Sequence, residues 1–289
     1  MYKKNKLIFI SLNDIKSFNK NQFHIFFKKM IFSGYIFILQ SNPYISNIVR
    51  FVRNDISESF KKELFYNYNT KTKKESYLQK KLQDYQEEFK KNCFIKKNFS
   101  LFLNSIGLST KNTFIDQICL RVSSPKKGQD FGILPRATAH RDTWSSNLSE
   151  QINWWFPIKS IIDTNSLYFV PEYFKRIIRN TSADWNYFKY KQNPDKFTST
   201  PTIKDPGVIK NKKLIIRPRV GEIVCFSGHH LHGSNPGDAI RLNIETRSIS
   251  LGDHTKFRIP KKIDYHGRGK KLKWFKGLES KNCLSLYYK

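Results

Sequence analysis

The chain has 289 residues, and its 52 Lys and Arg against 23 Asp and Glu give a formal net charge of +29 at pH 7. Hydrophobic residues make up 39% and aromatic residues 15%, which is enough for a buried core and excludes a wholly disordered chain. No repeat of fixed period is present, which argues against a solenoid. Apolar runs such as residues 30–39 are shorter than the roughly 20 residues that cross a bilayer.

The positive charge raises the question of a nucleic-acid partner. Because the excess is dominated by Lys and accompanied by abundant Asn, Ile, Phe and Tyr, it is typical of a genome poor in G and C, and we do not expect nucleic-acid binding. Segment 256–289 mixes basic and aromatic residues most densely. The four scattered cysteines show no disulfide or zinc spacing, and no secretory signal is evident, so we expect a cytoplasmic protein.

The first part of the chain predicts helices around one early strand. Residues 34–39 are a short β-prone run that follows a helix. Residues 72–92 predict a surface helix, with Thr72 and Glu75 in the pattern of a capping box. The apolar positions of this helix recur at spacings of 4, 3 and 4 residues: Leu78, Leu82, Tyr85 and Phe89.

After about residue 112 the pattern changes to short strands separated by turn residues. The candidate strands are 118–122, 151–156, 166–170, 214–216, 222–226 and 239–250. We therefore predict an α+β fold with a mainly β core, a double-stranded β-helix (jelly roll, cupin-like) with N-terminal helices packed on one sheet. The expected parts are a strand and helical scaffold (1–111), the core (112–251, with an insertion at 171–213) and a basic C-terminal extension (252–289).

Two groups of residues have the side chains of a metal site. His140 and Asp142 are two positions apart, so both side chains project from the same side of an extended segment. His229, His230 and His232 follow the strand predicted at 222–226. Two imidazoles and one carboxylate form the facial triad of non-haem Fe(II) oxygenases, which leaves coordination positions open. A structural zinc site would instead close its fourth position with sulfur or nitrogen.

The strand predicted at 239–250 has one polar face, on which Arg241 and Arg247 both lie. An Arg that projects into a β core is costly unless it meets an anion, and its planar fork suits a carboxylate. A salt bridge to Glu245 or Glu222 is the alternative explanation for either arginine.

With these residues in place, the sequence resembles the Fe(II)/2-oxoglutarate-dependent oxygenases of the phytanoyl-CoA dioxygenase family. The matching blocks, in chain order, are 34–37, His140 with Asp142, 167–171, 220–226, and His232 with Ser234 followed by Arg241. The resemblance implies that His140, Asp142 and His232 bind Fe(II), and that 2-oxoglutarate and O2 occupy the open positions. It implies further that Arg241 and Ser234 hold the distal carboxylate of 2-oxoglutarate.

The implied reaction is hydroxylation of a small organic substrate, polar or sugar-like, with release of succinate and CO2. Related halogenases lack the carboxylate ligand, so Asp142 favours hydroxylation. Arg247 is the alternative to Arg241, because nine residues from His232 to Arg241 is a short interval for the family. His230 is the weaker alternative to His232.

The strand predicted at 151–156 places Gln151, Asn153 and Trp155 on one face and Ile152, Trp154 and Phe156 on the other. We expect Gln151 and Asn153 to contact cosubstrate or substrate, and Trp144 to lie at the pocket rim. Two other functions stay open at this point. One is a non-catalytic jelly-roll module that binds nucleic acid or acidic glycans through a basic surface. The other is a cupin-like sugar isomerase or epimerase.

Overall fold

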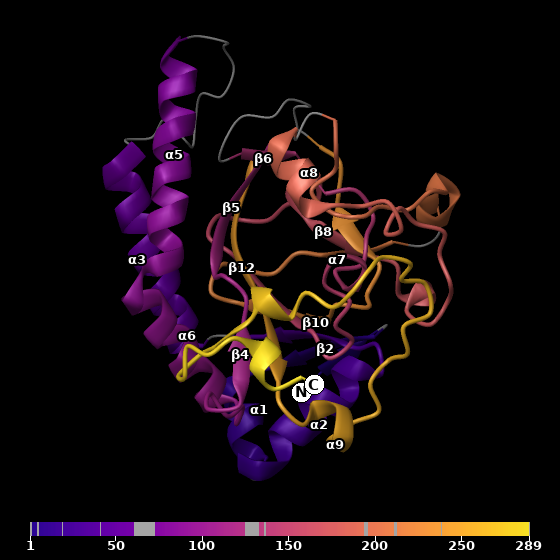
Figure 1. Ribbon diagram of the computed structural model, residues 1–289. Helices are drawn as coiled ribbons and strands as arrows, with labels where there is room; N and C mark the ends of the chain where they lie inside the picture. Colours follow the sequence, from indigo (N-terminus) through magenta and orange to yellow (C-terminus); the bar gives the residue numbers. More distant parts are fainter. Residues whose placement is uncertain are drawn as a thin grey trace.

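The computed structural model describes residues 2–4, 6–18, 20–40, 42–60, 73–124, 133–135, 137–193, 196–210, 213–237 and 239–288 (Figure 1). Over these ranges the protein is a mixed α/β structure with a large sheet, a small sheet and several helices. The helices are α1 (Leu12–Ser17), α2 (Lys20–Phe32), α3 (Pro43–Phe60), α5 (Lys73–Lys91), α6 (Cys93–Ser105), α7 (Thr143–Ser146), α8 (Tyr187–Gln192) and α9 (Asp253–Lys256). None of the described helices is both long and apolar enough to cross a membrane.

The large sheet has the strand order β1-β2-β3-β10-β7-β12-β4-β13, and β5 pairs with both β12 and β6. Its strands are β1 (Tyr2–Lys4), β2 (Leu7–Ile10), β3 (Ile36–Leu39), β4 (Thr113–Ile115), β5 (Cys119–Ser124), β6 (Ile133–Pro135), β7 (Ile152–Pro157), β10 (Ile223–Ser227), β12 (Arg241–Ser250) and β13 (Lys276–Gly277). The small sheet has the order β11-β8-β9, with β8 (Leu167–Phe169), β9 (Leu214–Ile216) and β11 (His232–Ser234).

Aromatic side chains join the helices to one face of the large sheet. Trp154 of β7 is fully buried there, with its ring stacked on Phe27 of α2 at a centroid distance of 5.6 Å. Phe99 and Phe102 of α6 meet the same indole edge-on. Figure 1 shows α3, α5 and α6 along the side of the sheet that contains β5 and β12. Burying one such side chain stabilises the fold by roughly 1.5–3 kcal/mol.

The opposite face of the large sheet turns toward the small sheet and is divided into an apolar and a polar part. Trp155, Val224 and Phe226 pack against Leu167 and Phe169 of β8 in one hydrophobic cluster. Along β12 the same face is polar, with these four side chains in alternate positions: Arg241, Asn243, Glu245 and Arg247. A polar strip next to the end of the small sheet is where a site for charged ligands can form.

All of the expected strands are confirmed. The segment 214–216 is β9, and the strands expected at 34–39, 118–122, 151–156, 166–170, 222–226 and 239–250 are β3, β5, β7, β8, β10 and β12 with bounds shifted by one or two residues. The helix expected at 72–92 is α5, with Leu82 and Phe89 buried and Tyr85 partly buried. Thr72 of the expected capping box and the side chain of Leu78 lie outside the described part of the chain.

Candidate metal centre

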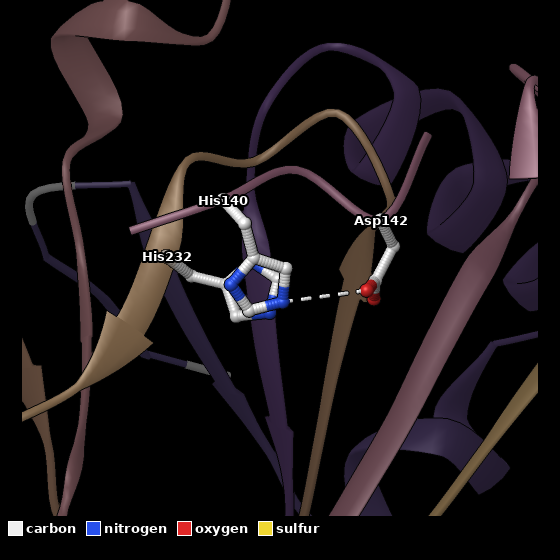
Figure 2. Close-up of side chains that lie close together, drawn as sticks. All are labelled: His140, Asp142 and His232. Atoms are coloured by element: carbon white, nitrogen blue, oxygen red, sulfur yellow. Dashed lines mark ion pairs between the residues drawn. The ribbon is translucent and has the colours of Figure 1, made fainter. Parts of the chain in front are cut away.

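The metal-ligand candidates from two distant parts of the sequence are hydrogen-bonded neighbours. His140 and His232 form an antiparallel bridge, with N–H···O distances of 2.9 and 3.0 Å in the two directions. His232 begins β11, which pairs with β8. Asp142 directly precedes α7, two residues beyond His140. Because the backbone bridge fixes the two segments relative to each other, the three side chains converge on one point (Figure 2).

The distances within this group suit a metal ion. One ligand atom from each of His140, Asp142 and His232 lies within 4.8 Å of the others. Nε2 of His140 is 3.5 Å from Oδ1 of Asp142, and the two imidazole rings have centroids 4.4 Å apart. All three residues are only 5–6% exposed. Their charges and lone pairs are thus largely removed from solvent.

Backbone carbonyls set the tautomer of both imidazoles. Nδ1 of His140 donates to the carbonyl of Thr138 at 2.8 Å, and Nδ1 of His232 donates to the carbonyl of His230 at 3.0 Å. A carbonyl oxygen only accepts, so Nδ1 carries a proton, and in the neutral imidazole the lone pair is on Nε2. This is the hydrogen bond that metal-bound histidines usually make with their second nitrogen. Both rings are therefore prepared to bind a metal through Nε2.

Asp142 is held in its charged form. Burial raises the pKa of its carboxyl, but Arg247 and the neighbouring imidazoles outweigh this and hold that pKa well below its usual range. Nε and Nη2 of Arg247 each lie 3.5 Å from a carboxylate oxygen of Asp142. Burial lowers the pKa of His232 to about 3, so its imidazole is neutral at physiological pH. A neutral imidazole and a carboxylate are the forms that bind metals.

Arg247, expected as a cosubstrate contact, is paired with two carboxylates. Besides Asp142 it contacts Asp116, whose Oδ2 accepts from Nη1 of Arg247 at 2.8 Å. Oδ1 of Asp116 also accepts from the backbone N–H of Arg247 at 2.7 Å and from Thr246. Asp116 was not singled out in the sequence, since nothing in its local pattern marks it as a partner of a residue 131 positions away.

Arg241 lies on the same polar face and donates to two neutral side chains. It is 6% exposed, and its Nε donates to Oδ1 of Asn243 at 3.1 Å and its Nη2 to Oγ of Ser123 at 3.3 Å. Its guanidinium is 5.9 Å from the ring of Trp155. Nδ2 of Asn243 and Nε1 of Trp155 are buried and have no hydrogen-bond partner among the described residues. Two unsatisfied donors beside a buried guanidinium form a cradle suited to an anion.

Ser234 and Gln151 each have one buried polar atom without a partner in the described part of the chain: Oγ of Ser234 and Oε1 of Gln151. Ser234 lies two residues after His232 on β11, so both side chains project from the same side of that strand. Gln151 donates from Nε2 to Oδ1 of Asn153 at 2.8 Å. The two amides thus lie together beside Asp142, to which Asn153 donates.

Three other sequence candidates lie outside the group of convergent ligands. His229 and His230 are buried but do not belong to it. The ring of His230 packs on Phe174, with centroids 4.6 Å apart. Trp144, expected at a pocket rim, is instead 1% exposed in a hydrophobic cluster, because its position in α7 directs it away from solvent.

No known protein family matches the sequence, and no curated protein matches it. Among solved structures, the chain is similar to EvdO2 from Micromonospora carbonacea var. aurantiaca complexed with 2-oxoglutarate, with 13% identity over 75% of this chain and 86% of that chain and a TM-score of 0.45. It is also similar to the epimerase SnoN in complex with Fe3+, alpha ketoglutarate and nogalamycin RO (10% identity, 84% and 96% covered, TM-score 0.43). A third similar structure is the alpha ketoglutarate dependent carbocyclase SnoK from nogalamycin biosynthesis (14% identity, 90% and 96% covered, TM-score 0.43). Similarity of this extent does not assign the chain to a family.

Proposed function

We propose that the protein is a non-haem Fe(II) and 2-oxoglutarate-dependent dioxygenase that hydroxylates a small organic substrate. The observation that carries this proposal is the convergence of His140, Asp142 and His232, with both Nε2 lone pairs and a charged carboxylate aimed at one point. Within the described residues this group has no fourth His, Cys, Asp or Glu, as a closed structural zinc site would need. Two histidines and one carboxylate with open positions are the ligand set of Fe(II) oxygenases.

The surroundings of Arg241 support 2-oxoglutarate as the cosubstrate. A buried guanidinium with unsatisfied donors from Asn243 and Trp155 beside it would pair with the distal carboxylate of the diacid. The hydroxyl of Ser234, buried and without a described partner, is a further donor on the side of His232. With iron and 2-oxoglutarate bound, the site would couple reduction of O2 and decarboxylation to succinate and CO2 with hydroxylation of a substrate carbon.

The protein's own side chains perform the remaining tasks. Arg247 and Asn153 hold Asp142 in place and charged, which keeps this ligand position closed to a halide and favours hydroxylation over halogenation. We further propose that the two sheets form a double-stranded β-helix, with residues 1–111 as its scaffold, 112–251 as its core and 252–289 as an extension. The substrate proposed is a polar small molecule, and the proposed location is the cytoplasm.

An anaerobic titration tests the proposal directly. Adding Fe(II) and then 2-oxoglutarate to the full chain should give a weak visible charge-transfer band, and aerobic incubation with a metabolite panel should release succinate. The variant Asp142→Ala should lose both signals. Asp163→Ala removes an exposed carboxylate at the surface and should keep them. Equal turnover by Asp142→Ala and the unmodified chain would contradict the metal role of this residue.

A further inference from the structure

Arg141 lies between the two proposed ligands His140 and Asp142 and is completely buried. Its Nη2 donates to the backbone carbonyls of Tyr173 and Arg176, the latter at 2.7 Å. Its Nε and Nη1 have no hydrogen-bond partner among the residues described. The segment that contains His140 and Asp142 is therefore joined to residues 173–176 through the side chain of Arg141, a cation with no contact to solvent.

A buried carboxylate of the C-terminal extension lies beside this cation. Oδ2 of Asp264 is 3.6 Å from Nη2 of Arg141, and the residue is 4% exposed. Oδ1 of Asp264 accepts from Nε1 of Trp144 at 2.8 Å, and Oδ2 accepts from the backbone N–H of Ile178 at 3.2 Å. Asp264 thus contacts side chains on either side of Asp142 and the backbone of the segment that covers them.

Further hydrogen bonds join the extension to the residues that follow Asp142. Asn147 ends α7 in the left-handed region, with φ of 58°, a conformation that Asn tolerates better than most residues. Its side chain accepts from Nζ of Lys262 at 2.8 Å and donates to the carbonyl of Gly269 at 3.1 Å. The N–H of Lys271 donates to the carbonyl of Ser146 at 2.8 Å. Residues 262–271 therefore lie directly against the short helix that starts at the proposed ligand.

Electrostatics makes Asp264 the central residue of this contact. Removing the counter-charge of a buried ion leaves that ion uncompensated, which is far more costly than losing a surface pair. Arg141 would then have to move toward water or toward another acceptor. Because its neighbours in sequence are His140 and Asp142, any such movement displaces the side chains that converge on the metal position.

We infer that Asp264 is a positioning residue for the metal centre, acting through Arg141 and Trp144; this inference rests on the proposed function, which assigns His140 and Asp142 as ligands. The C-terminal extension is accordingly a structural part of the site. Residues that orient metal ligands typically change metal affinity by about 10- to 100-fold when they are replaced. We expect an effect of about 10-fold or more for the loss of the Asp264 charge.

The chain offers a matched control. Asp253 lies in the same extension, is 3% exposed and pairs with Nζ of Lys28 at 2.6 Å, on the side of α2. Asp253→Asn and Asp264→Asn each remove one buried negative charge. Both substitutions keep the size of the side chain and one of its oxygens. If Asp264 only stabilises the fold, both variants should lose stability and both should retain the metal affinity of the unmodified chain. A positioning role predicts that Asp264→Asn alone loses metal affinity.

The experiment is a titration of the full chain and both variants with Co(II), followed by its visible absorption, together with urea unfolding of each. Asp264→Asn should bind Co(II) about 10-fold or more weakly, and Asp253→Asn should bind like the unmodified chain. Equal affinity in Asp264→Asn and the unmodified chain overturns the inference while leaving the proposed function intact. If the unmodified chain does not bind Co(II), the proposed function fails, and the inference fails with it.

A second variant covers the case in which Asp264→Asn does not fold. Trp144→Phe keeps an aromatic ring in the cluster but removes the N–H that donates to Asp264. It should weaken Co(II) binding several-fold, because Asp264 loses one of the groups that fix its orientation toward Arg141. Unchanged Co(II) affinity in Trp144→Phe would then overturn the inference.

Discussion

Nδ2 of Asn153 donates to Oδ2 of Asp142 at 2.5 Å. Asn153 lies on β7 directly opposite Arg247 of β12, so an amide and a guanidinium from adjacent strands approach the same carboxylate. Gln151 fixes the orientation of this amide, because its Nε2 donates to Oδ1 of Asn153. Oδ2 of Asp142 accepts this short hydrogen bond, whereas Oδ1 has only long contacts, at 3.5 Å to Nε2 of His140 and 3.5 Å to Nη2 of Arg247, so Oδ1 is the oxygen better placed to bind a metal.

Replacing Asn153 tests the importance of this orientation. Asn153→Ala should weaken Fe(II) or Co(II) binding by about 10-fold, since the carboxylate loses the donor that fixes its rotation. It should also lower the free energy of unfolding by about 1–3 kcal/mol, because a buried acceptor loses a partner. Asn98→Ala, which removes a buried amide from α6 far from the site, is the control. Metal affinity that is equally unchanged in both variants would argue against a role for Asn153.

Arg247 neutralises two carboxylates, and its removal should affect both. In Arg247→Met, Asp116 and Asp142 both lose the cation that they share, and the pKa of Asp142 should rise because Arg247 lowers it. We expect metal binding to require a higher pH and the free energy of unfolding to fall by about 2 kcal/mol or more. Adding Asp116→Asn to this variant should recover part of the stability. Urea unfolding of the single and double variants measures this coupling, and strict additivity would show that Asp116 and Arg247 are independent.

The sequence was sufficient to predict the candidate ligands and the strands that carry the polar face. The alternation of polar and apolar residues at 151–156 and 239–250 is a local signal with a period of two. The structure has strands β7 and β12 at these positions. His140 and Asp142 were identifiable because both lie in one short segment, and His232 because histidines cluster after β10. The resemblance favoured His232, with His230 as the weaker alternative, and in the folded chain it is His232 that pairs with His140 through a backbone bridge.

The groups that support the ligands were not predictable from local patterns. Asp116 and Arg247 are 131 residues apart, and Trp144 and Asp264 are 120 residues apart, so neither pair has a characteristic spacing. The N-terminal β2 was also missed as a strand, because a run of four apolar residues has too few positions to show a period. It becomes a strand by parallel pairing with β3, a tertiary interaction.

Buried histidines predict that the metal-free protein loses stability as the pH falls. Burial lowers the pKa of His229 and His232 to about 3 and that of His230 to about 4. In the unfolded chain these groups have pKa values of about 6.5, so below this pH the unfolded chain binds protons that the folded chain does not. The free energy of unfolding should decrease by about 1.4 kcal/mol per pH unit for each such histidine. Asp142 stays charged over this range because its pKa is held well below normal.

Urea unfolding in a metal chelator, at a series of pH values from 7 to 5, measures this dependence. The variant His230→Phe removes one titrating group from a pocket that already contains Phe169 and Phe174, and it should reduce the slope. His266→Gln changes an exposed side chain and should leave the slope as it is. A free energy of unfolding that is constant from pH 7 to pH 5 would contradict the assignment of these histidines as neutral and buried.

Replacing each arginine of β12 by Lys should affect a different binding step: cosubstrate binding for Arg241 and metal binding for Arg247. Arg241→Lys keeps the charge but loses the planar fork that pairs with a carboxylate, so 2-oxoglutarate should half-saturate the Fe(II) charge-transfer band at a concentration about 10-fold or more higher, with Fe(II) affinity unchanged. Arg247→Lys should do the reverse, weakening Fe(II) binding through Asp142, because Arg247 contacts the ligand carboxylate directly. If Arg247→Lys instead weakens only 2-oxoglutarate binding, Arg247 is the cosubstrate residue and the buried cradle around Arg241 serves another anion.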